Sequence, residues 1–167
     1  MTKVKILNTT EIQQKINRLA YEVYENNFNE KNLLIVGIEG NGYKIASSLA
    51  EKLKEISSVN ILLGKIKIDK DKPWEGGAEI DFDPKIFVNK TTILVDDVLN
   101  SGKTLIYAVK LFLDKPIKKL STVVLVDRSH NRFPVKADYV GLTLSTTLQE
   151  HIETDFSKKG NEAVYLI

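Results

Sequence analysis

The residues best suited to chemistry in this sequence are two adjacent acids, Asp96 and Asp97, which follow the apolar run Thr92–Val95 and precede Asn100–Thr104. The apolar run predicts a buried strand, and the spacing of apolar residues predicts a helix over Gly102–Leu113. The first N–H groups of such a helix lack intrahelical partners and lie at the positive end of the helix dipole. These amides could hold a phosphate, and the two carboxylates could accept hydrogen bonds from vicinal hydroxyls. Together they would bind a ribose 5-phosphate.

Three other interpretations of the segments around these glycines are distinguishable from the sequence. A purely structural one is a pair of strand-end acids followed by a helix that Ser101 caps. A Walker A loop is excluded because it needs glycine at position 97, which is Asp97. A dinucleotide fingerprint at Gly40-Asn41-Gly42 is excluded because it needs Gly or Ala at position 45, which is Ile45.

Apolar runs alternate with helical patterns, which predicts an α/β fold with a mostly parallel central sheet flanked by helices. We expect a single domain over residues 1–167, since this length leaves little room for a second. Ligands of such sheets bind at the carboxyl ends of the strands, so the loops that begin at Glu39, Asp69, Asp96 and Asp127 should form the site. We expect helices over residues 11–27, 42–56 and 102–113, the first of them capped by Thr9 or Thr10. We expect strands over residues 33–38, 59–68, 92–95 and 122–126. Two short strands, 139–142 and 163–167, should finish the same sheet.

The composition indicates a folded protein with a balanced surface. Lys and Arg number 24 against 22 Asp and Glu, and a net charge of +2 does not by itself indicate nucleic-acid binding. The sequence has no cysteine, which excludes disulfides, thiolate zinc sites and cysteine nucleophiles. No run approaches the roughly 20 apolar residues that span a bilayer, and no signal peptide is recognisable, so we expect a cytoplasmic protein without a membrane partner. The arginines are Arg18, Arg128 and Arg132, and arginine-dependent chemistry must use one of them.

The segment Val95–Thr104, VDDVLNSGKT, resembles the diphosphoribosyl-binding motif of type I phosphoribosyltransferases. Val36–Tyr43 is similar to the pyrophosphate loop of that family. Leu125–His130, Ala137–Gly141 and the first helix around Ile16–Glu22 resemble one subfamily, the pyrimidine operon attenuator/uracil phosphoribosyltransferases (PyrR). The resemblance spans nearly the whole chain, and it implies the α/β fold of the family and at least a homodimer.

The resemblance also implies an activity. Such enzymes are pentosyltransferases that bind 5-phosphoribosyl 1-diphosphate (PRPP) with Mg²⁺ and transfer its ribosyl group to a nucleobase, uracil in this subfamily, with release of pyrophosphate in nucleotide salvage. Which residues would contact the metal is left open. The implied site consists of the acids Asp96 and Asp97 at the ribose hydroxyls; Asn100, Ser101, Gly102, Lys103 and Thr104 at the 5-phosphate; Glu39, Gly40, Asn41 and Gly42 at the pyrophosphate; and Asp127 and Arg128 near the base.

Three departures from the family pattern bear on this activity. Gly40-Asn41 stands where the subfamily carries Thr-Arg, and the loop Asp69–Asp81, which we expect to be a mobile lid, has no arginine. Lys70 or Lys72 could replace the missing charge, although lysine lacks the bidentate geometry of arginine. Asn100 replaces an acid of purine-specific relatives, and an amide cannot accept a proton at neutral pH, which counts against purine salvage. We therefore expect slow turnover with a pyrimidine.

Two classes of function stay open. The first is the enzyme described above, and the second is a regulator that senses a nucleotide, or binds RNA, with little catalysis. The subfamily binds messenger RNA partly through an arginine and a histidine on the first helix. This chain has Arg18 but carries Tyr21 at the histidine position, so its sequence gives RNA binding only weak support.

Overall fold

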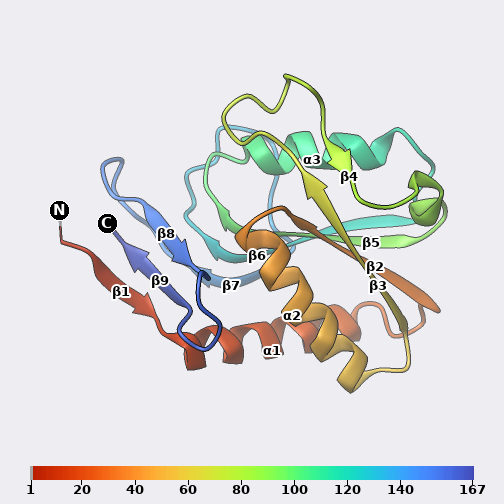
Figure 1. Ribbon diagram of the computed structural model, residues 1–167, viewed down its shortest axis with the longest axis horizontal. Helices are drawn as coiled ribbons and strands as arrows, with labels where there is room; N and C mark the ends of the chain where they lie inside the picture. Colours follow the sequence, from red (N-terminus) through yellow and green to blue (C-terminus); the bar gives the residue numbers. More distant parts are fainter. Residues whose placement is uncertain (1) are drawn as a thin grey trace.

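The computed structural model describes residues 2–167, which form two β-sheets (Figure 1). The larger sheet has six strands in the order β4-β3-β2-β5-β6-β7, all parallel except β4, which pairs antiparallel with β3. The prediction of a mostly parallel central sheet is therefore confirmed. Its strands are β2 (Asn32–Ile38), β3 (Asn60–Lys67), β4 (Glu79–Ile80), β5 (Thr91–Leu99), β6 (Lys119–Asp127) and β7 (Tyr139–Thr143).

Helices cover both faces of this sheet (Figure 1). Helices α1 (Thr9–Glu25) and α2 (Asn41–Ile56) pack on one face, and α3 (Lys103–Leu113) covers the other with the 3-10 helix η1 (Pro84–Phe87). The central strands are thus buried on both sides, which explains why their sequences are continuous apolar runs rather than alternating ones. Among the helices formed by residues 2–167, none has the length and apolar character needed to cross a membrane.

The first helix is capped by Asn8, and not by Thr9 or Thr10 as expected from the sequence. The Glu11 N–H donates to Oδ1 of Asn8 at 2.9 Å, and the Asn8 N–H donates to Oε2 of Glu11 at 2.8 Å. This reciprocal capping box satisfies two N–H groups that would otherwise lack partners. The Thr9 hydroxyl donates instead to the carbonyl oxygen of Glu162 at 2.9 Å.

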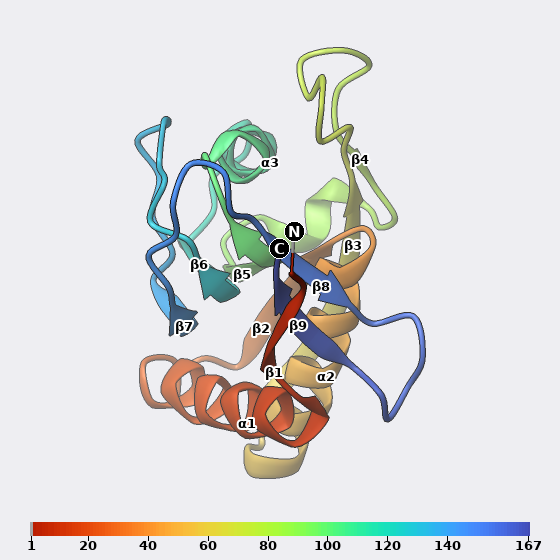
Figure 2. The same cartoon turned by 90° about the vertical axis from the view of Figure 1, so that its left-hand side faces the viewer.

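The expectation that the last strand finishes the central sheet is wrong. Strand β9 (Ala163–Leu166) lies in a separate antiparallel sheet between β1 (Val4–Leu7) and β8 (Ile152–Asp155), which we call the hood sheet. Figures 1 and 2 show the hood sheet beyond the carboxyl ends of the central strands. Edge pairing with β1 and β8, neither of which was expected, therefore takes β9 away from the central sheet.

Two segments lie at the carboxyl edge of the central sheet, where the candidate site is expected. Strand β5 runs to Leu99, so Asp96 and Asp97 lie within the strand rather than in the loop after it. Residues 69–81, the 69–81 loop, leave β3 and return as β4; Figure 2 shows the loop standing out from the edge of the sheet.

Candidate active site

The two adjacent acids lie where β5 reaches the carboxyl edge of the sheet. Asp96 is almost fully buried, and the exposed fraction of the Asp97 side chain is 13%. The Asp97 N–H donates to Oδ1 of Asp96 at 2.9 Å, and the Val98 N–H donates to Oδ1 of Asp97 at 2.9 Å. Each carboxylate is therefore oriented by the backbone amide that follows it.

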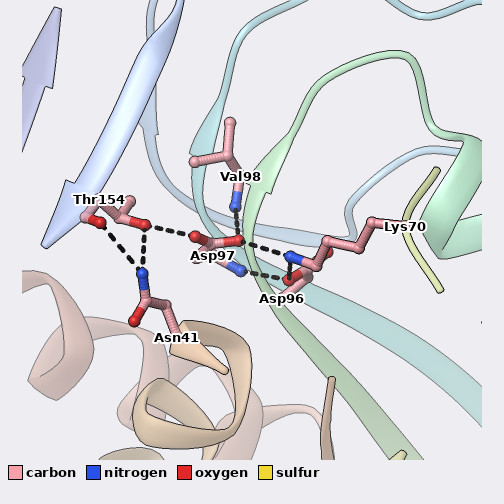
Figure 3. A network of polar contacts seen from close by, with 6 residues as sticks. All are labelled: Asn41, Lys70, Asp96, Asp97, Val98 and Thr154. Carbon is pink, nitrogen blue, oxygen red and sulfur yellow. Dashed lines mark hydrogen bonds and ion pairs between the residues drawn. The ribbon is translucent and has the colours of Figure 1, made fainter. Parts of the chain in front are cut away.

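Lys70, from the 69–81 loop, faces both acids (Figure 3). Its Nζ lies 3.6 Å from Oδ1 of Asp96 and 3.7 Å from Oδ1 of Asp97. Burial, joined by the charge of Asp97, raises the pKa of Asp96 to about 8. Burial alone would also raise the pKa of Asp97, but the ammonium of Lys70 and a hydroxyl hydrogen bond hold that pKa below its ordinary value. Of this coupled pair, Asp96 therefore holds a proton more tightly, and Asp97 bears more of the negative charge.

Asp97 is also connected to the hood sheet and to α2 (Figure 3). The hydroxyl of Thr154, in β8, donates to Oδ2 of Asp97. Nδ2 of Asn41, the first residue of α2, donates to the Thr154 hydroxyl oxygen at 2.9 Å and to its carbonyl oxygen at 3.1 Å. The amide of Asn41 is therefore engaged by the hood sheet.

The start of α2 packs closely against the first acid. Gly40 caps this helix with φ 97°, a conformation that favours glycine, and it makes no side-chain capping bond. A Cβ at Gly42 would lie 2.9 Å from Oδ1 of Asp96 and 3.1 Å from its Cα. Glycine at position 42 therefore allows the N-terminus of α2, with the exposed Glu39 just before it, to lie beside the acid pair.

The turn after β5 leads into α3 through a left-handed glycine. Gly102, with φ 86°, caps the helix without a side-chain bond, so Ser101 does not cap it as the structural interpretation required. The Ser101 hydroxyl oxygen accepts from the Lys103 N–H at 3.2 Å, within the turn. A small pocket opens here, and its lining comprises Asp96, Val98, Leu99, Asn100, Ser101, Gly102, Lys103, Thr104, Leu105 and Val124.

The 69–81 loop rests on the first turns of α3. Nζ of Lys103 donates to the carbonyl oxygen of Asp71 at 3.0 Å and lies 5.8 Å from the ring centroid of Trp74. The Trp74 ring in turn lies 6.4 Å from the ring of Tyr107. The side chain of Lys103 is thus directed at the loop rather than into the turn that it follows.

On the side of β6, Arg128 is buried and its guanidinium has defined partners. It donates from Nη1 to Oδ1 of Asn100 at 2.7 Å and from Nε to the hydroxyl of Thr146 at 2.6 Å. It also donates to the carbonyl oxygens of Thr147 and Glu150. Arg128 thereby fastens the 144–150 segment, which leads to the hood sheet, to the turn after β5.

Comparison with known proteins identifies the family. Residues 4–157 match the model of the phosphoribosyl transferase domain. The chain belongs to the phosphoribosyltransferase family. Curated relatives named Bifunctional protein PyrR include one from Oceanobacillus iheyensis, 33% identical over 96% of this chain and 94% of its own length, and one from Streptococcus mutans, 35% identical over 91% and 88%. These identities place the phosphoribosyltransferase in the PyrR subfamily.

Solved structures agree on the fold. The hypoxanthine phosphoribosyltransferase of Trypanosoma cruzi superimposes with a TM-score of 0.78 and 16% identity, covering 98% of this chain and 95% of that one. A hypoxanthine-guanine phosphoribosyltransferase from Bacillus anthracis gives a TM-score of 0.75 and 17% identity, covering 97% and 96%. At these identities the likeness shows the phosphoribosyltransferase fold alone. The chain is a PRPP-dependent phosphoribosyltransferase, and PRPP and a nucleobase are its substrates.

Arg18 and Asp127, which the sequence indicated as candidate functional residues, form hydrogen bonds within the chain. Arg18 donates to Oε1 of Glu22 at 2.8 Å and to the carbonyl oxygen of Gly141 at 2.6 Å. Asp127 accepts from the Ser129 N–H at 2.8 Å and so shapes the turn after β6. Arg18 thus lies against β7 at the end of the sheet, apart from the acid pair.

Thr154 is a residue of the candidate site that the sequence does not indicate. A lone threonine in a short polar strand has no spacing or motif that indicates a role. Its placement depends on the hood sheet, which was not expected, so only the tertiary structure brings it to the candidate site.

Proposed function

We propose that this phosphoribosyltransferase transfers the ribosyl group of Mg-PRPP to uracil, with release of pyrophosphate, in nucleotide salvage. The observation that supports it most is the position of Asp96 and Asp97 beside the turn that opens α3. One ligand that carries both vicinal hydroxyls and a phosphate can engage both features at once. Ribose 5-phosphate, the common part of PRPP and a nucleotide, is such a ligand.

In this proposal the acid pair holds the ribose. Asp97, which bears more of the charge, accepts a hydrogen bond from one hydroxyl, and Asp96 binds the neighbouring hydroxyl, to which it can also donate when it is protonated. The 5-phosphate binds the first amides of α3 and the hydroxyls of Ser101 and Thr104, where the helix dipole favours an anion. Fixing both ends of the sugar positions its anomeric carbon for attack by the base.

The diphosphate then lies toward the start of α2, at Glu39, Gly40, Asn41 and Gly42. The N-terminus of this helix favours negative charge, but Asn41 offers no cation and its amide is engaged with Thr154. Lys70 is positioned to supply a charge once it leaves the acid pair. Because a point charge replaces the expected arginines, slow turnover stays our prediction.

Magnesium fits the site as an ion carried by the substrate. The described residues, 2–167, contain no group of three or more His, Cys, Asp or Glu side chains arranged to hold a metal. Mg²⁺ commonly binds through substrate phosphates and waters with few protein carboxylates, and such an ion needs no complete protein site. When bound, it would offset the negative charge of the leaving pyrophosphate.

The base would lie near the turn after β6, at Asp127 and Arg128, and Asn100, in the turn that holds the 5-phosphate, fixes the Arg128 guanidinium. Asn100 is an amide whose oxygen accepts from Arg128, so it cannot act as a proton acceptor for a purine nitrogen. A homodimer is part of this proposal. The regulatory alternative, RNA binding, gains no support from Arg18, whose guanidinium bonds Glu22 and β7.

The experiment that tests the proposal is an assay of pyrophosphate release from PRPP and Mg²⁺ with each of four bases: uracil, hypoxanthine, guanine and xanthine. We expect slow release with uracil and less with the purines. Release with a purine but not with uracil would overturn the choice of base. Binding of PRPP without release with any base would favour the regulator.

A further inference from the structure

Thr154 is joined by hydrogen bonds to two parts of the site that are distant in sequence (Figure 3). Asn41 Nδ2 donates to its hydroxyl oxygen at 2.9 Å, and its hydroxyl donates to Oδ2 of Asp97. A hydroxyl has only one proton to donate. Since the amide of Asn41 is a donor, it leaves the proton of Thr154 free to point at the carboxylate, and the direction of the chain of bonds is fixed.

Thr154 completes the set of partners around Asp97. Oδ1 of Asp97 accepts from the Val98 N–H at 2.9 Å and faces Nζ of Lys70 at 3.7 Å, whereas Oδ2 is held by Thr154. The two oxygens are therefore fixed from opposite sides. Without the Thr154 hydroxyl, Oδ2 would lose the partner that sets the rotation of the carboxylate about its Cβ–Cγ bond.

The hydroxyl itself is held in place by the rest of the chain. Asn41 also donates to the Thr154 carbonyl oxygen at 3.1 Å, and Lys44 Nζ donates to the carbonyl oxygen of Phe156 at 2.8 Å. The same helix, α2, packs against Asp96 at Gly42. The hood sheet, α2 and β5 are thus fastened to one another around the acid pair.

We propose that Thr154 is a positioning residue for PRPP binding: its hydroxyl, oriented by Asn41, holds the carboxylate of Asp97 in the orientation that accepts the ribose hydroxyl. The inference deepens the proposed function and rests on the role assigned there to Asp97. Thr154 acts through Asp97 and does not itself contact the substrate. An effect on PRPP binding, separate from an effect on folding, distinguishes this role from that of a simple anchor of the hood sheet.

The test uses the full chain and measures the Kd of Mg-PRPP by calorimetry, with thermal unfolding measured in parallel. Thr154→Val keeps the shape and removes the hydroxyl, and we expect PRPP to bind about tenfold more weakly, the usual size for a hydrogen bond to a charged group. Thr154→Ser should bind within about twofold of the wild type. If the valine variant fails to fold, the difference in Kd between Thr154→Ser and Thr154→Ala gives the contribution of the hydroxyl in a smaller side chain.

The matched control is Thr9→Val. It removes a hydrogen bond from the Thr9 hydroxyl to the carbonyl oxygen of Glu162, the residue before β9, at a place without contact to Asp97. We expect it to lower the unfolding temperature without changing the Kd. Equal weakening by Thr9→Val and Thr154→Val, or no weakening by Thr154→Val and no difference between Ser and Ala, would overturn the inference.

Asp97→Asn separates this inference from the proposed function. If Asp97→Asn binds PRPP as tightly as the wild type does, the role of Asp97 is wrong and both fail. If Asp97→Asn weakens binding and Thr154→Val does not, only the positioning role of Thr154 fails.

Discussion

Nζ of Lys70 lies 3.6 Å from Oδ1 of Asp96, which joins the 69–81 loop to the central strand β5. The loop therefore has a cation at the place where we propose that the ribose hydroxyls bind. In this proposal PRPP displaces the ammonium of Lys70 from the two acids, and the same ammonium then faces the diphosphate.

Replacing Lys70 separates these two effects. In Lys70→Met we expect ribose 5-phosphate, which lacks the diphosphate, to bind at least as tightly as in the wild type. Pyrophosphate release should fall by about 10- to 100-fold, because a charge-stabilising donor to the leaving group is lost. Calorimetry with ribose 5-phosphate and a steady-state assay with PRPP measure the two quantities.

Lys72→Met is the control for this variant. Lys72 belongs to the same loop, is exposed and pairs with Glu75 at 3.7 Å. It should leave both quantities within about twofold, as most surface changes do. Equal loss of activity in the two variants would mean that only the net charge of the loop matters to the reaction. The position of Lys70 beside the acids would then have no effect of its own.

The pKa of Asp96 predicts a pH dependence of stability. Burial raises that pKa to about 8, so the folded chain binds a proton that the unfolded chain releases above about pH 4. The free energy of unfolding should therefore decrease as the pH rises from about 4 to 8, by at most about 1.4 kcal/mol per pH unit. The lowered pKa of Asp97 affects stability only below this range. Denaturant unfolding at pH 5, 6, 7 and 8 measures the slope.

Asp96→Asn is the matched variant for the pH series, because it keeps the shape and does not titrate. Its free energy of unfolding should vary less between pH 5 and pH 8 than that of the wild type. Parallel curves for the two proteins would show that Asp96 titrates outside this range.

Arg128 should restrict the motion of residues 144–150, the segment that leads to the hood sheet. In Arg128→Met we expect faster amide exchange over residues 144–150 and a higher KM for the base, since the hydrogen bonds to Thr146, Thr147 and Glu150 are lost. The Kd of PRPP should change less. Arg132→Gln is the control, because Arg132 is an exposed arginine nearby. Unchanged exchange over 144–150 in Arg128→Met would contradict the fastening role.

Trp74 offers a direct signal of loop movement, since it is the sole tryptophan of the sequence and is 58% exposed. We expect Mg-PRPP to change the fluorescence of Trp74 and to slow amide exchange over residues 69–81, because the loop closes over the ligand. Identical emission and identical exchange with and without PRPP would show that the loop does not close.

The central sheet and the acid pair were predictable because their signals are local. Continuous apolar runs indicated the strands that lie between helices, and Asp96-Asp97 followed by a small-residue turn indicated an anion site. The hood sheet was not predictable in the same way: β1, β8 and β9 are four residues each, and their pairing depends on chain segments at opposite ends of the sequence. Asn8 was missed as a cap because Thr9 and Thr10, which follow it, are also favourable capping residues.

The partners of the charged side chains were likewise not predictable from the sequence. Lys70 was one of two candidate cations, and the structure brings it, not Lys72, within 4 Å of the acids. Arg128 was expected near the base, but its guanidinium is engaged by Asn100 and the 144–150 segment. Partners of this kind come from loops whose course depends on the whole fold, so no local pattern reports them.

We propose that Asp96 and Asp97, with the start of α3, hold the ribose 5-phosphate part of PRPP. The most direct measurement is a crystal structure of the protein with ribose 5-phosphate. We expect the phosphate within hydrogen-bond distance of the 101–104 amides and the ribose hydroxyls on the side chains of Asp96 and Asp97. A sugar bound elsewhere, with Lys70 still paired to the two acids, would contradict it.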